Sequence, residues 1–447
     1  MSRVALIGEN SVEYIDTLLG IWNNGDCAVL LDWRIPFQTA VQLMQEADVQ
    51  KCYIEKKQLH MESFLLPKDI EFITFEKKSN SAEYLPEEIY KKYKPNYSRD
   101  EAVVIYSSGT TGKSKGIILS YYAINTNAEA IIDYMNLIPD DCIYIAKTLS
   151  HSSTLTGELL VALKTHTRII VAPTIVPPRY ILANIKKYSV SIICLNPTLL
   201  LMLVEELHRG NYSISELRTL YVSGSILNDK LYNKSHETLK DIAIYNVYGL
   251  SEAGPRVTAQ TADCCKSNSV GKPIKGIDVA VVDEQGNPIK ETERGIIHVN
   301  TPSRFEGYIS GAEKHRSLYK GWLNTGDIGC LNEYGELHIV DRVDDVIFID
   351  SHKIYPSEIE RQIIKSTVIN ECAVLSFKSN GENIIGCLYT AETVFANIKQ
   401  QLASVLMTYE IPRFFLKCDS IPRTLNGKIS KTQVIKMLQN KFDSDRM

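Results

Sequence analysis

The sequence lacks a long apolar run and an excess of positive charge. No uninterrupted apolar stretch approaches the roughly 20 residues of a membrane-spanning helix. Glu9, Glu13 and Asp16 interrupt the N-terminal segment, where a signal peptide would need a continuous apolar core. With a formal net charge of −4, the chain also lacks the basic excess that nucleic-acid binding requires. We therefore expect a cytoplasmic protein with no membrane span and no nucleic-acid partner.

Cysteines at metal-binding or disulfide-type spacings are also lacking. The 447 residues include 10 cysteines but no C-x-x-C motif. The neighbouring Cys264 and Cys265 suit neither a metal site nor an easy disulfide. We expect reduced cysteines that pack in the interior, as is usual in the cytoplasm.

Apolar patterns divide the chain into regions. In the first half, strand-like runs alternate with helical stripes, as in VALIG followed by EYIDTLLGIW, which predicts layered α/β subdomains with largely parallel sheets. From about Val270, short alternating runs separated by Gly, Asn and Pro predict a β-barrel or sandwich. A helix from Pro356 and two later strand-like runs predict a small α+β domain. We expect an α/β fold with a large domain over 1–341, a small domain over 342–447 and a hinge near Asp344.

The segment SSGTTGKSKG at 107–116 contains Gly-Lys-Ser but does not match a Walker A loop. That loop requires glycine five positions before Gly112, where this chain has Ser107. A Walker A loop also leads directly into a helix. Here the run GIILS predicts a strand, and helical periodicity begins only after Ser120, a suitable N-cap. A P-loop ATPase or kinase is disfavoured, and a plain Gly- and Ser-rich surface turn is an alternative.

Six motifs occur in an order that resembles one known family. They are YSSGTTGKSKG (106–116), NVYGLSEAG (246–254), WLNTGDIG (322–329), VDRVDDVI (340–347), HKIYPSEIE (352–360) and PRTLNGKI (422–429). In this order they resemble the adenylate-forming superfamily of acyl-CoA synthetases, peptide-synthetase adenylation domains and luciferases. The resemblance extends from about Val4 to the C-terminus, and it rests on the motif order because each motif alone is a weak signal.

The resemblance implies an ATP site. The residues implied to bind the β- and γ-phosphates through backbone N–H groups and hydroxyls are Ser107, Ser108, Gly109, Thr110, Thr111, Gly112 and Lys115. Those implied to hold the rest of the nucleotide are Gly224, Ser225, Asn246, Tyr248, Gly249, Asp327 and Arg342. Tyr248 would stack on adenine, and Asp327 would accept hydrogen bonds from the ribose. Core packing and an ordinary turn are the plainer alternatives for these two residues.

The resemblance also implies the residues of catalysis. Lys428 would bridge the acid carboxylate and the α-phosphate and stabilise the charge that develops there. Glu252 would bind Mg²⁺ on the phosphates, and Thr111 of the phosphate loop completes the catalytic set. Asp344 would be the hinge about which a mobile small domain moves between two half-reactions. Outside these motifs, Lys428 and Glu252 would be ordinary solvated charges.

Three features depart from the family pattern. Ser114 stands where proline is usual, and Asp341 stands where glycine is usual. Asp350 and Ser351 occupy a loop that normally contains glycine and lines the tunnel for a pantetheine thiol. The last departure predicts a narrower tunnel or a changed acceptor.

The acid pocket is predicted from the segment LSHSST. His151 stands where amino-acid-activating relatives often carry an aspartate for the substrate amine. We expect His151 and Gly224 to line a pocket for a carboxylic acid without an α-ammonium group. A packing or gating histidine is the alternative.

We therefore predict an ATP- and Mg²⁺-dependent ligase that forms an acyl-adenylate and pyrophosphate and then transfers the acyl group to CoA. The alternative acceptor is the phosphopantetheine arm of an acyl or peptidyl carrier protein. A nucleotide-binding scaffold without turnover is a remote alternative, which the joint presence of Lys428, Glu252 and Asp327 opposes.

Overall fold

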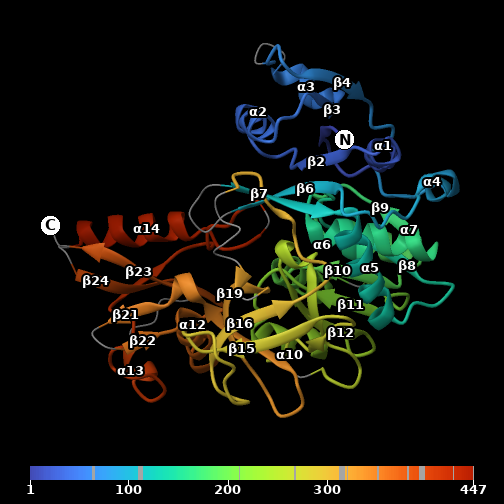
Figure 1. Ribbon diagram of the computed structural model, residues 1–447. Helices are drawn as coiled ribbons and strands as arrows, with labels where there is room; N and C mark the ends of the chain where they lie inside the picture. Colours follow the sequence, from blue (N-terminus) through green and yellow to red (C-terminus); the bar gives the residue numbers. More distant parts are fainter. Residues whose placement is uncertain are drawn as a thin grey trace.

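The computed structural model shows a larger region and, to one side of it, a smaller C-terminal region (Figure 1). It describes residues 1–62, 66–108, 114–210, 212–265, 268–311, 318–319, 321–349, 352–379, 382–391, 398–425 and 427–445.

Seven strands form the first sheet. Their spatial order is β17 (Gly307–Tyr308), β7 (Ser114–Ser120), β6 (Glu101–Ser108), β2 (Cys27–Leu31), β1 (Arg3–Ile7), β3 (Lys51–Glu55) and β4 (Glu71–Phe75). β6, β2, β1, β3 and β4 are parallel, whereas β7 pairs antiparallel with β6, and β17 with β7. β2, with the sequence CAVLL, is buried at every residue, as expected of a central parallel strand covered on both faces.

Eight strands form the second sheet. Their order is β14 (Lys272–Pro273), β13 (Arg256–Ala259), β12 (Ala243–Gly249), β11 (Thr219–Val222), β10 (Ile192–Leu195), β8 (Cys142–Ile145), β9 (Arg168–Val171) and β5 (Glu83–Tyr84). β9, β8, β10, β11 and β12 are parallel, and the outer strands are antiparallel. Both sheets are therefore mixed, because antiparallel strands extend a parallel centre.

The expected β-barrel is an open sheet instead. Its antiparallel strands follow the order β15 (Asp278–Val282), β16 (Gly295–Asn300), β19 (Trp322–Leu331) and β18 (Leu318–Tyr319), and β20 (Leu337–Arg342) also pairs with β19. In the part of the chain that the structure describes, no pairing joins β15 to β18 or β20, so the sheet does not close.

Helices pack around the sheets (Figure 1). In the larger region they are α1 (Val12–Asn23), α2 (Phe37–Glu46), α3 (Lys56–Glu62), α4 (Glu87–Lys92), α5 (Tyr121–Met135), α6 (Ser152–Thr154), the π-helix η2 (Leu155–Leu160), α7 (Val161–Thr165), α8 (Pro178–Lys187), α9 (Pro197–Arg209), α10 (Asp229–Thr238) and the 3₁₀ turn η3 (Ser251–Ala253). The predicted N-cap of α5 is confirmed, since the Ser120 side chain accepts a hydrogen bond from Ala123 N at 3.2 Å.

The C-terminal region follows a 3₁₀ turn, η4 (Val343–Asp345). It contains a hairpin of β21 (Ile347–Ile349) and β22 (His352–Ile354), a sheet of β23 (Glu371–Ser379), β24 (Glu382–Thr390) and β25 (Phe414–Lys417), and the helices α12 (Pro356–Ser366), α13 (Ile398–Leu402) and α14 (Lys431–Ser444). Alternate residues of β23 enter different apolar clusters: Cys372 and Val374 pack with α12, and Ala373 and Phe377 pack with α14. The region therefore has apolar cores of its own on both faces of one sheet.

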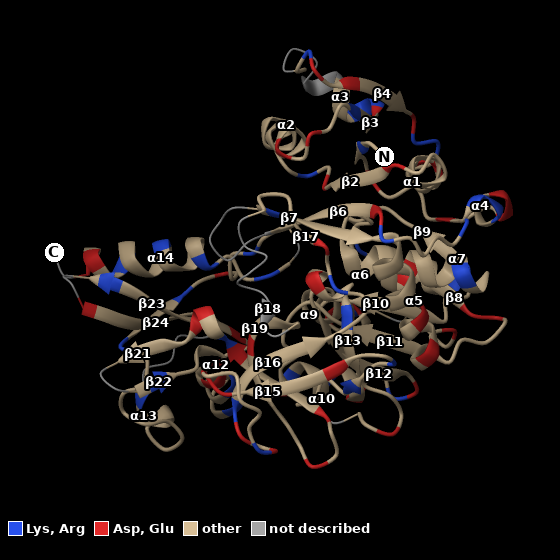
Figure 2. Cartoon of the chain, viewed as in Figure 1, with Lys and Arg blue, Asp and Glu red and all other residues tan. Residues whose placement is uncertain are grey.

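Charges of both signs are interspersed over the two regions (Figure 2). This distribution agrees with the nearly balanced count of 49 basic and 53 acidic residues. Among the residues described, no helix combines the length and the apolar character needed to cross a membrane.

Candidate active site

Three predicted nucleotide residues meet where β12, β19 and β20 come together. The Tyr248 hydroxyl, at the end of β12, donates a hydrogen bond of 2.6 Å to Asp327 Oδ2. Asp327 and Arg342 are register partners on β19 and β20, and Arg342 Nε lies 3.3 Å from Asp327 Oδ1. Each carboxylate oxygen of Asp327 thus has its own neighbour, which fixes the orientation of the carboxylate.

Asp327 occupies a poorly solvated position, with only 8% of the residue exposed. Burial raises the pKa of Asp327, while the Arg342 guanidinium, the Tyr248 hydroxyl and Lys428 lower it. The preceding Gly326 has a φ of +71°, and a Cβ there would lie 3.1 Å from Arg342 Nη2. A glycine turn therefore allows the carboxylate and the guanidinium to approach each other.

The loop that carries Lys428 reaches this site from the far end of the chain. Arg34, which follows β2, donates a hydrogen bond from Nη1 to Leu425 O at 2.8 Å. Thr198, in the first turn of α9, donates from Oγ1 to Gly427 O at 3.3 Å. These two contacts, made by segments that follow strands of different sheets, dock the loop on the larger region.

Lys428 is exposed to solvent but has charged groups of the site around it. Desolvation by the surrounding protein lowers the pKa of Lys428, and the positive charge of Arg342 lowers this pKa further. The carboxylates of Asp327 and Glu252 act in the opposite direction and raise it. The structure thus brings Lys428 into the same electrostatic environment as Glu252, Asp327 and Arg342.

Glu252 lies in η3, directly after β12. Its Oε1 accepts a hydrogen bond of 3.0 Å from the Tyr308 hydroxyl, and within the described ranges no hydrogen bond reaches Oε2. Those ranges also contain no cluster of three or more His, Cys, Asp or Glu that could hold a metal. A single carboxylate with one oxygen available fits Mg²⁺ on a nucleotide, because this ion usually takes one or two carboxylates and completes its shell with phosphate oxygens and water.

The predicted phosphate loop is described only at its two ends. Ser107 and Ser108 end β6, and Ser107 is the register partner of Lys115 on β7. The strand after the loop is therefore confirmed, in place of a Walker A helix. The central residues Gly109, Thr110, Thr111 and Gly112 lie outside the described residues.

His151 precedes α6, and its Nδ1 accepts a hydrogen bond from Ser153 N at 3.2 Å. Burial lowers the pKa of His151 to about 3, and the charges of Lys147 and Lys428 add to this effect. The imidazole is therefore neutral near pH 7, within electrostatic reach of Lys428. The other predicted pocket residue, Gly224, lies with Ser225 on the exposed turn after β11.

Two further predicted nucleotide residues have contacts that organise the backbone. Asn246 is buried, and its Nδ2 donates to Ser269 O at 3.2 Å. At Gly249, a Cβ would lie 1.9 Å from Pro255 O, so only glycine allows this approach of two backbone segments. These contacts support the position of Tyr248 between the two residues.

The predicted hinge residue Asp344 is exposed in η4. Just before it, Asp341 Oδ2 accepts a hydrogen bond of 2.8 Å from Ser357 N in the first turn of α12. The aspartate that replaces the usual glycine therefore caps a helix on the other side of the turn. Asp350 and Ser351, the third departure, lie outside the described residues.

Arg34, Thr198 and Tyr308 belong to none of the six motifs and were not predicted from the sequence. A signal existed for the first two, because each follows a parallel strand within a few residues, and ligand sites of α/β sheets gather at such carboxyl ends. Tyr308 gave no comparable signal, since its strand β17 contains only two residues.

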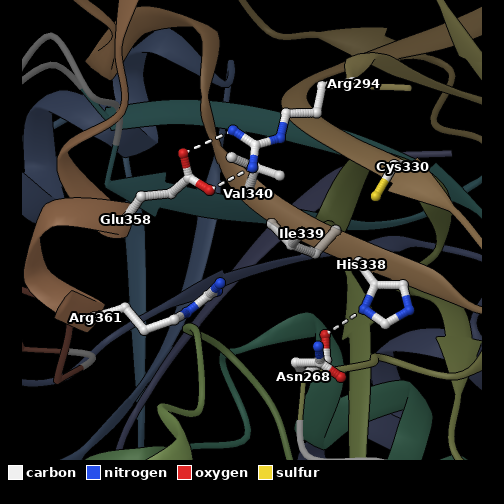
Figure 3. Close-up of a pocket in the computed structure, with 8 residues that line it drawn as sticks. All are labelled: Asn268, Arg294, Cys330, His338, Ile339, Val340, Glu358 and Arg361. Carbon is white, nitrogen blue, oxygen red and sulfur yellow. Dashed lines mark hydrogen bonds and ion pairs between the residues drawn. The ribbon is translucent and has the colours of Figure 1, made fainter. Parts of the chain in front are cut away.

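A cavity of about 160 Å³ lies apart from the predicted site residues, between the five-stranded sheet and α12 (Figure 3). Arg294 and Glu358 form two contacts of 2.7 Å at its edge. The His338 ring donates from Nδ1 to Asn268 O at 2.7 Å. The Arg294–Glu358 pair joins the larger region to α12, so the cavity belongs to the contact between the two regions.

Residues 1–309 match the protein family described as AMP-binding enzyme. Among curated proteins, the chain is similar to the 2-succinylbenzoate–CoA ligase of Bacillus mycoides (strain KBAB4), with 27% identity over 450 residues that cover 98% of this chain and 89% of the relative. The enzyme of the same name from Enterococcus faecalis (strain ATCC 700802 / V583) is 26% identical over 439 residues, covering 96% and 87% of the two chains.

Solved structures share the fold. ATP-bound MatB from Rhodopseudomonas palustris superposes with a TM-score of 0.86 at 21% identity, over 98% of this chain and 88% of the other. O-succinylbenzoate coenzyme A synthetase from Bacillus subtilis, in complex with ATP and magnesium, gives a TM-score of 0.83 at 21% identity, over 97% and 89%.

Proposed function

The chain belongs to the AMP-binding enzyme family, and on that premise we propose that it activates a carboxylic acid with ATP and transfers the acyl group to CoA. The acid carboxylate attacks the α-phosphate, which forms an acyl-adenylate and releases pyrophosphate. The CoA thiol then attacks the acyl carbon, and AMP leaves. The observation that carries the proposal is the docking of the Lys428 loop beside Asp327, Arg342 and Glu252.

In this proposal Lys428 is the residue that acts on the reacting atoms. Attack of one anion on another concentrates negative charge, and a partly desolvated ammonium group stabilises it. The docking contacts at Leu425 and Gly427 support this role because they restrict the loop on both sides of residue 426. Removing one such electrostatic contact typically slows catalysis by about two to three orders of magnitude.

The adenosine site is proposed at Tyr248, Asp327 and Arg342. Asp327 would accept hydrogen bonds from the ribose hydroxyls, which suits a carboxylate whose oxygens have several lone pairs. The fixed neighbours of both oxygens support this assignment, because the acceptor is oriented before the nucleotide binds. Gly224, Ser225, Asn246 and Gly249 would line the adenine and support the Tyr248 ring.

The phosphates would lie on the β6–β7 turn with Lys115, and Glu252 would hold Mg²⁺ against them. When bound, the ion neutralises phosphate charge. The available Oε2 of Glu252 supports this arrangement, and so does Lys428, whose pKa responds to the charge of Glu252.

The acceptor and the acid are proposed from the relatives. The relatives at 26–27% identity are named as CoA ligases, which supports CoA over a carrier-protein phosphopantetheine arm. Their named acid, 2-succinylbenzoate, is the first to test. The neutral His151 at the position of the amine-binding aspartate supports an acid without an α-ammonium group.

We place the hinge between the half-reactions at Asp344, with residues 342–447 as the mobile domain. Its exposed position in a short turn supports this, because no residue of η4 is buried and a change of backbone angles there need not disturb the apolar core. Rotation would separate Arg34 from Leu425 and Arg294 from Glu358.

Product analysis tests the proposal. The protein is incubated with Mg-ATP, CoA and one acid from a panel of aryl, succinylaryl, fatty and amino acids. The proposal predicts AMP, pyrophosphate and an acyl-CoA thioester with at least one acid of the panel. ADP and phosphate would indicate an ATPase instead, ADP with a phosphorylated acid would indicate a kinase, and the absence of any product would favour a binding scaffold.

A further inference from the structure

We propose that Tyr308 is a positioning residue that orients Glu252 for Mg²⁺, so that binding of the metal to the ATP complex depends on the tyrosine hydroxyl. The proposal rests on the proposed function, in which Glu252 binds Mg²⁺ on ATP. It adds a residue that no predicted motif contains.

The contact between Tyr308 and Glu252 gives the two carboxylate oxygens different roles. The Tyr308 hydroxyl donates a hydrogen bond of 3.0 Å to Glu252 Oε1. A hydrogen bond to an ionised carboxylate is stronger than one between neutral groups, and it fixes the plane of the carboxylate. Oε2 then points in a defined direction as the oxygen left for the ion.

Tyr308 can orient Glu252 because its own position is rigid. The residue is only 8% exposed, and its ring packs edge-on against Phe305 with the ring centroids 4.9 Å apart. Backbone hydrogen bonds on both sides, Glu306 N to Ile118 O and Ile309 N to Gly116 O, each measure 2.8 Å and fasten the segment to β7. Phe305 N donates to Glu252 O at 2.9 Å, so the same segment also holds the backbone of η3.

The ring of Tyr308 also borders the proposed phosphate site. Lys115 Nζ lies 5.6 Å from the ring centroid, on β7 beside the phosphate loop. One tyrosine therefore contacts a proposed phosphate-binding lysine with its face and the proposed metal ligand with its hydroxyl. This places it between the two groups that a metal–nucleotide complex would bridge.

The test measures the affinity of the protein–ATP complex for Mn²⁺, a spectroscopic substitute for Mg²⁺. The electron spin resonance signal of free Mn²⁺ reports how much of the ion remains unbound. Tyr308→Phe removes the hydroxyl and keeps the ring. Loss of a hydrogen-bonded partner of a metal ligand typically weakens metal binding by about 10- to 100-fold. We expect a loss of this size, while ATP binding in EDTA stays close to that of the wild type. The rate of pyrophosphate exchange should recover at high Mg²⁺.

Tyr121→Phe is the matched control. Tyr121 is also buried, and its hydroxyl donates to a backbone carbonyl, Asp26 O, at 2.8 Å, so this variant removes a comparable hydrogen bond elsewhere. A double variant with Glu252→Gln should lose no more Mn²⁺ affinity than Glu252→Gln alone.

The outcomes separate this proposal from the function on which it rests. Unchanged Mn²⁺ affinity in Tyr308→Phe, or an equal loss of ATP affinity in EDTA, would overturn the positioning role while the wild type still binds Mn-ATP. A wild-type protein that binds no ATP would overturn the proposed function, and this proposal with it.

Discussion

Lys428 brings its charge into a site that already contains Arg342. Desolvation and the arginine lower the pKa of Lys428, and the carboxylates of Asp327 and Glu252 oppose them. The pKa of Lys428 therefore lies closer to neutral pH than that of an ordinary surface lysine, although its proposed role requires the protonated form. The same surroundings act on His151. Its pKa falls because burial disfavours the charged imidazolium, and the positive charges of Lys147 and Lys428 disfavour it further.

The lowered pKa of Lys428 predicts how adenylation depends on pH. In the proposed mechanism only the protonated lysine is active, so the rate of pyrophosphate–ATP exchange should fall as the pH rises through the folded-state pKa of Lys428, below the ordinary lysine value of 10.5. Lys428→Arg keeps a charge that does not titrate in this range, so any residual exchange should lose this alkaline limb. The same fall in exchange rate at alkaline pH in the wild type and in Lys428→Arg would contradict the assignment of this titration to Lys428.

His151 predicts a stability effect at acidic pH. The folded protein keeps this imidazole neutral down to about pH 3, whereas the unfolded chain binds a proton near the ordinary value of 6.5. The unfolded state thus holds more protons between these values, and folding stability falls as the pH falls through this window, by at most about 1.4 kcal/mol per pH unit.

The measurement is urea unfolding of the wild type and His151→Asn between pH 7 and pH 4. Asparagine can still accept the capping hydrogen bond from Ser153 N, so the variant should lose less stability over this range. Equal losses would show that His151 does not cause the acid sensitivity.

At the scale of single elements, Asp341, which stands where the family usually has glycine, connects two elements. It lies in β20, and its side chain accepts a hydrogen bond from the first turn of α12. A residue before η4 therefore caps the helix that follows it. The site is built in a similar way, since β12, β19 and β20 each contribute one of the residues Tyr248, Asp327 and Arg342.

Asp341→Ala should lower the free energy of unfolding of the C-terminal region by about 1 kcal/mol, the usual effect of losing an N-terminal helix cap. Asp341→Asn is the control, because its side-chain oxygen can still accept from Ser357 N. Native-state hydrogen exchange at amides of α12 would measure the difference. Equal protection in the two variants would mean that the cap contributes nothing.

Elements with strong local signals could be predicted from the sequence. The strand at 114–120, the Ser120 cap and the helix from Pro356 are all present because apolar periodicity and capping chemistry act over a few residues. The open sheet that replaced the expected barrel, and the mixed pairing of the first two sheets, depend on long-range edge pairing, which alternation of apolar residues does not encode. Tyr308 was missed for the same reason, since β7 rather than its own sequence places it.

For the whole molecule, the central feature is a site completed by residues far apart in the chain. Arg34 and Leu425 are in contact across 391 positions, and Thr198 and Gly427 across 229. Motif order placed Lys428, Glu252 and Asp327 in one site, but only the fold reveals which contacts hold the lysine loop there. The role of Asp344 as a hinge stays a prediction.

A substitution at Gly427 tests how strongly the docking of the Lys428 loop controls activity. Its φ is +79°, and a Cβ there would lie 2.9 Å from Asn196 Nδ2, so Gly427→Ala should displace the loop and slow pyrophosphate exchange by at least about tenfold. Gly335→Ala is the matched control, because Gly335 has a φ of +74° and an added Cβ there would have open space within 4 Å. Equal activity of the two variants would contradict the importance of docking.

The most direct test of the central claim is acid-dependent exchange of labelled pyrophosphate into ATP, with the wild type, Lys428→Ala and Lys353→Ala. Lys353 is a lysine of the same region that pairs with Glu284 away from the site. We predict exchange with at least one acid that lacks an α-ammonium group, a loss of about 100- to 1,000-fold in Lys428→Ala and little change in Lys353→Ala. Full exchange in Lys428→Ala, or no exchange by the wild type with any acid while ATP still binds, would contradict the account.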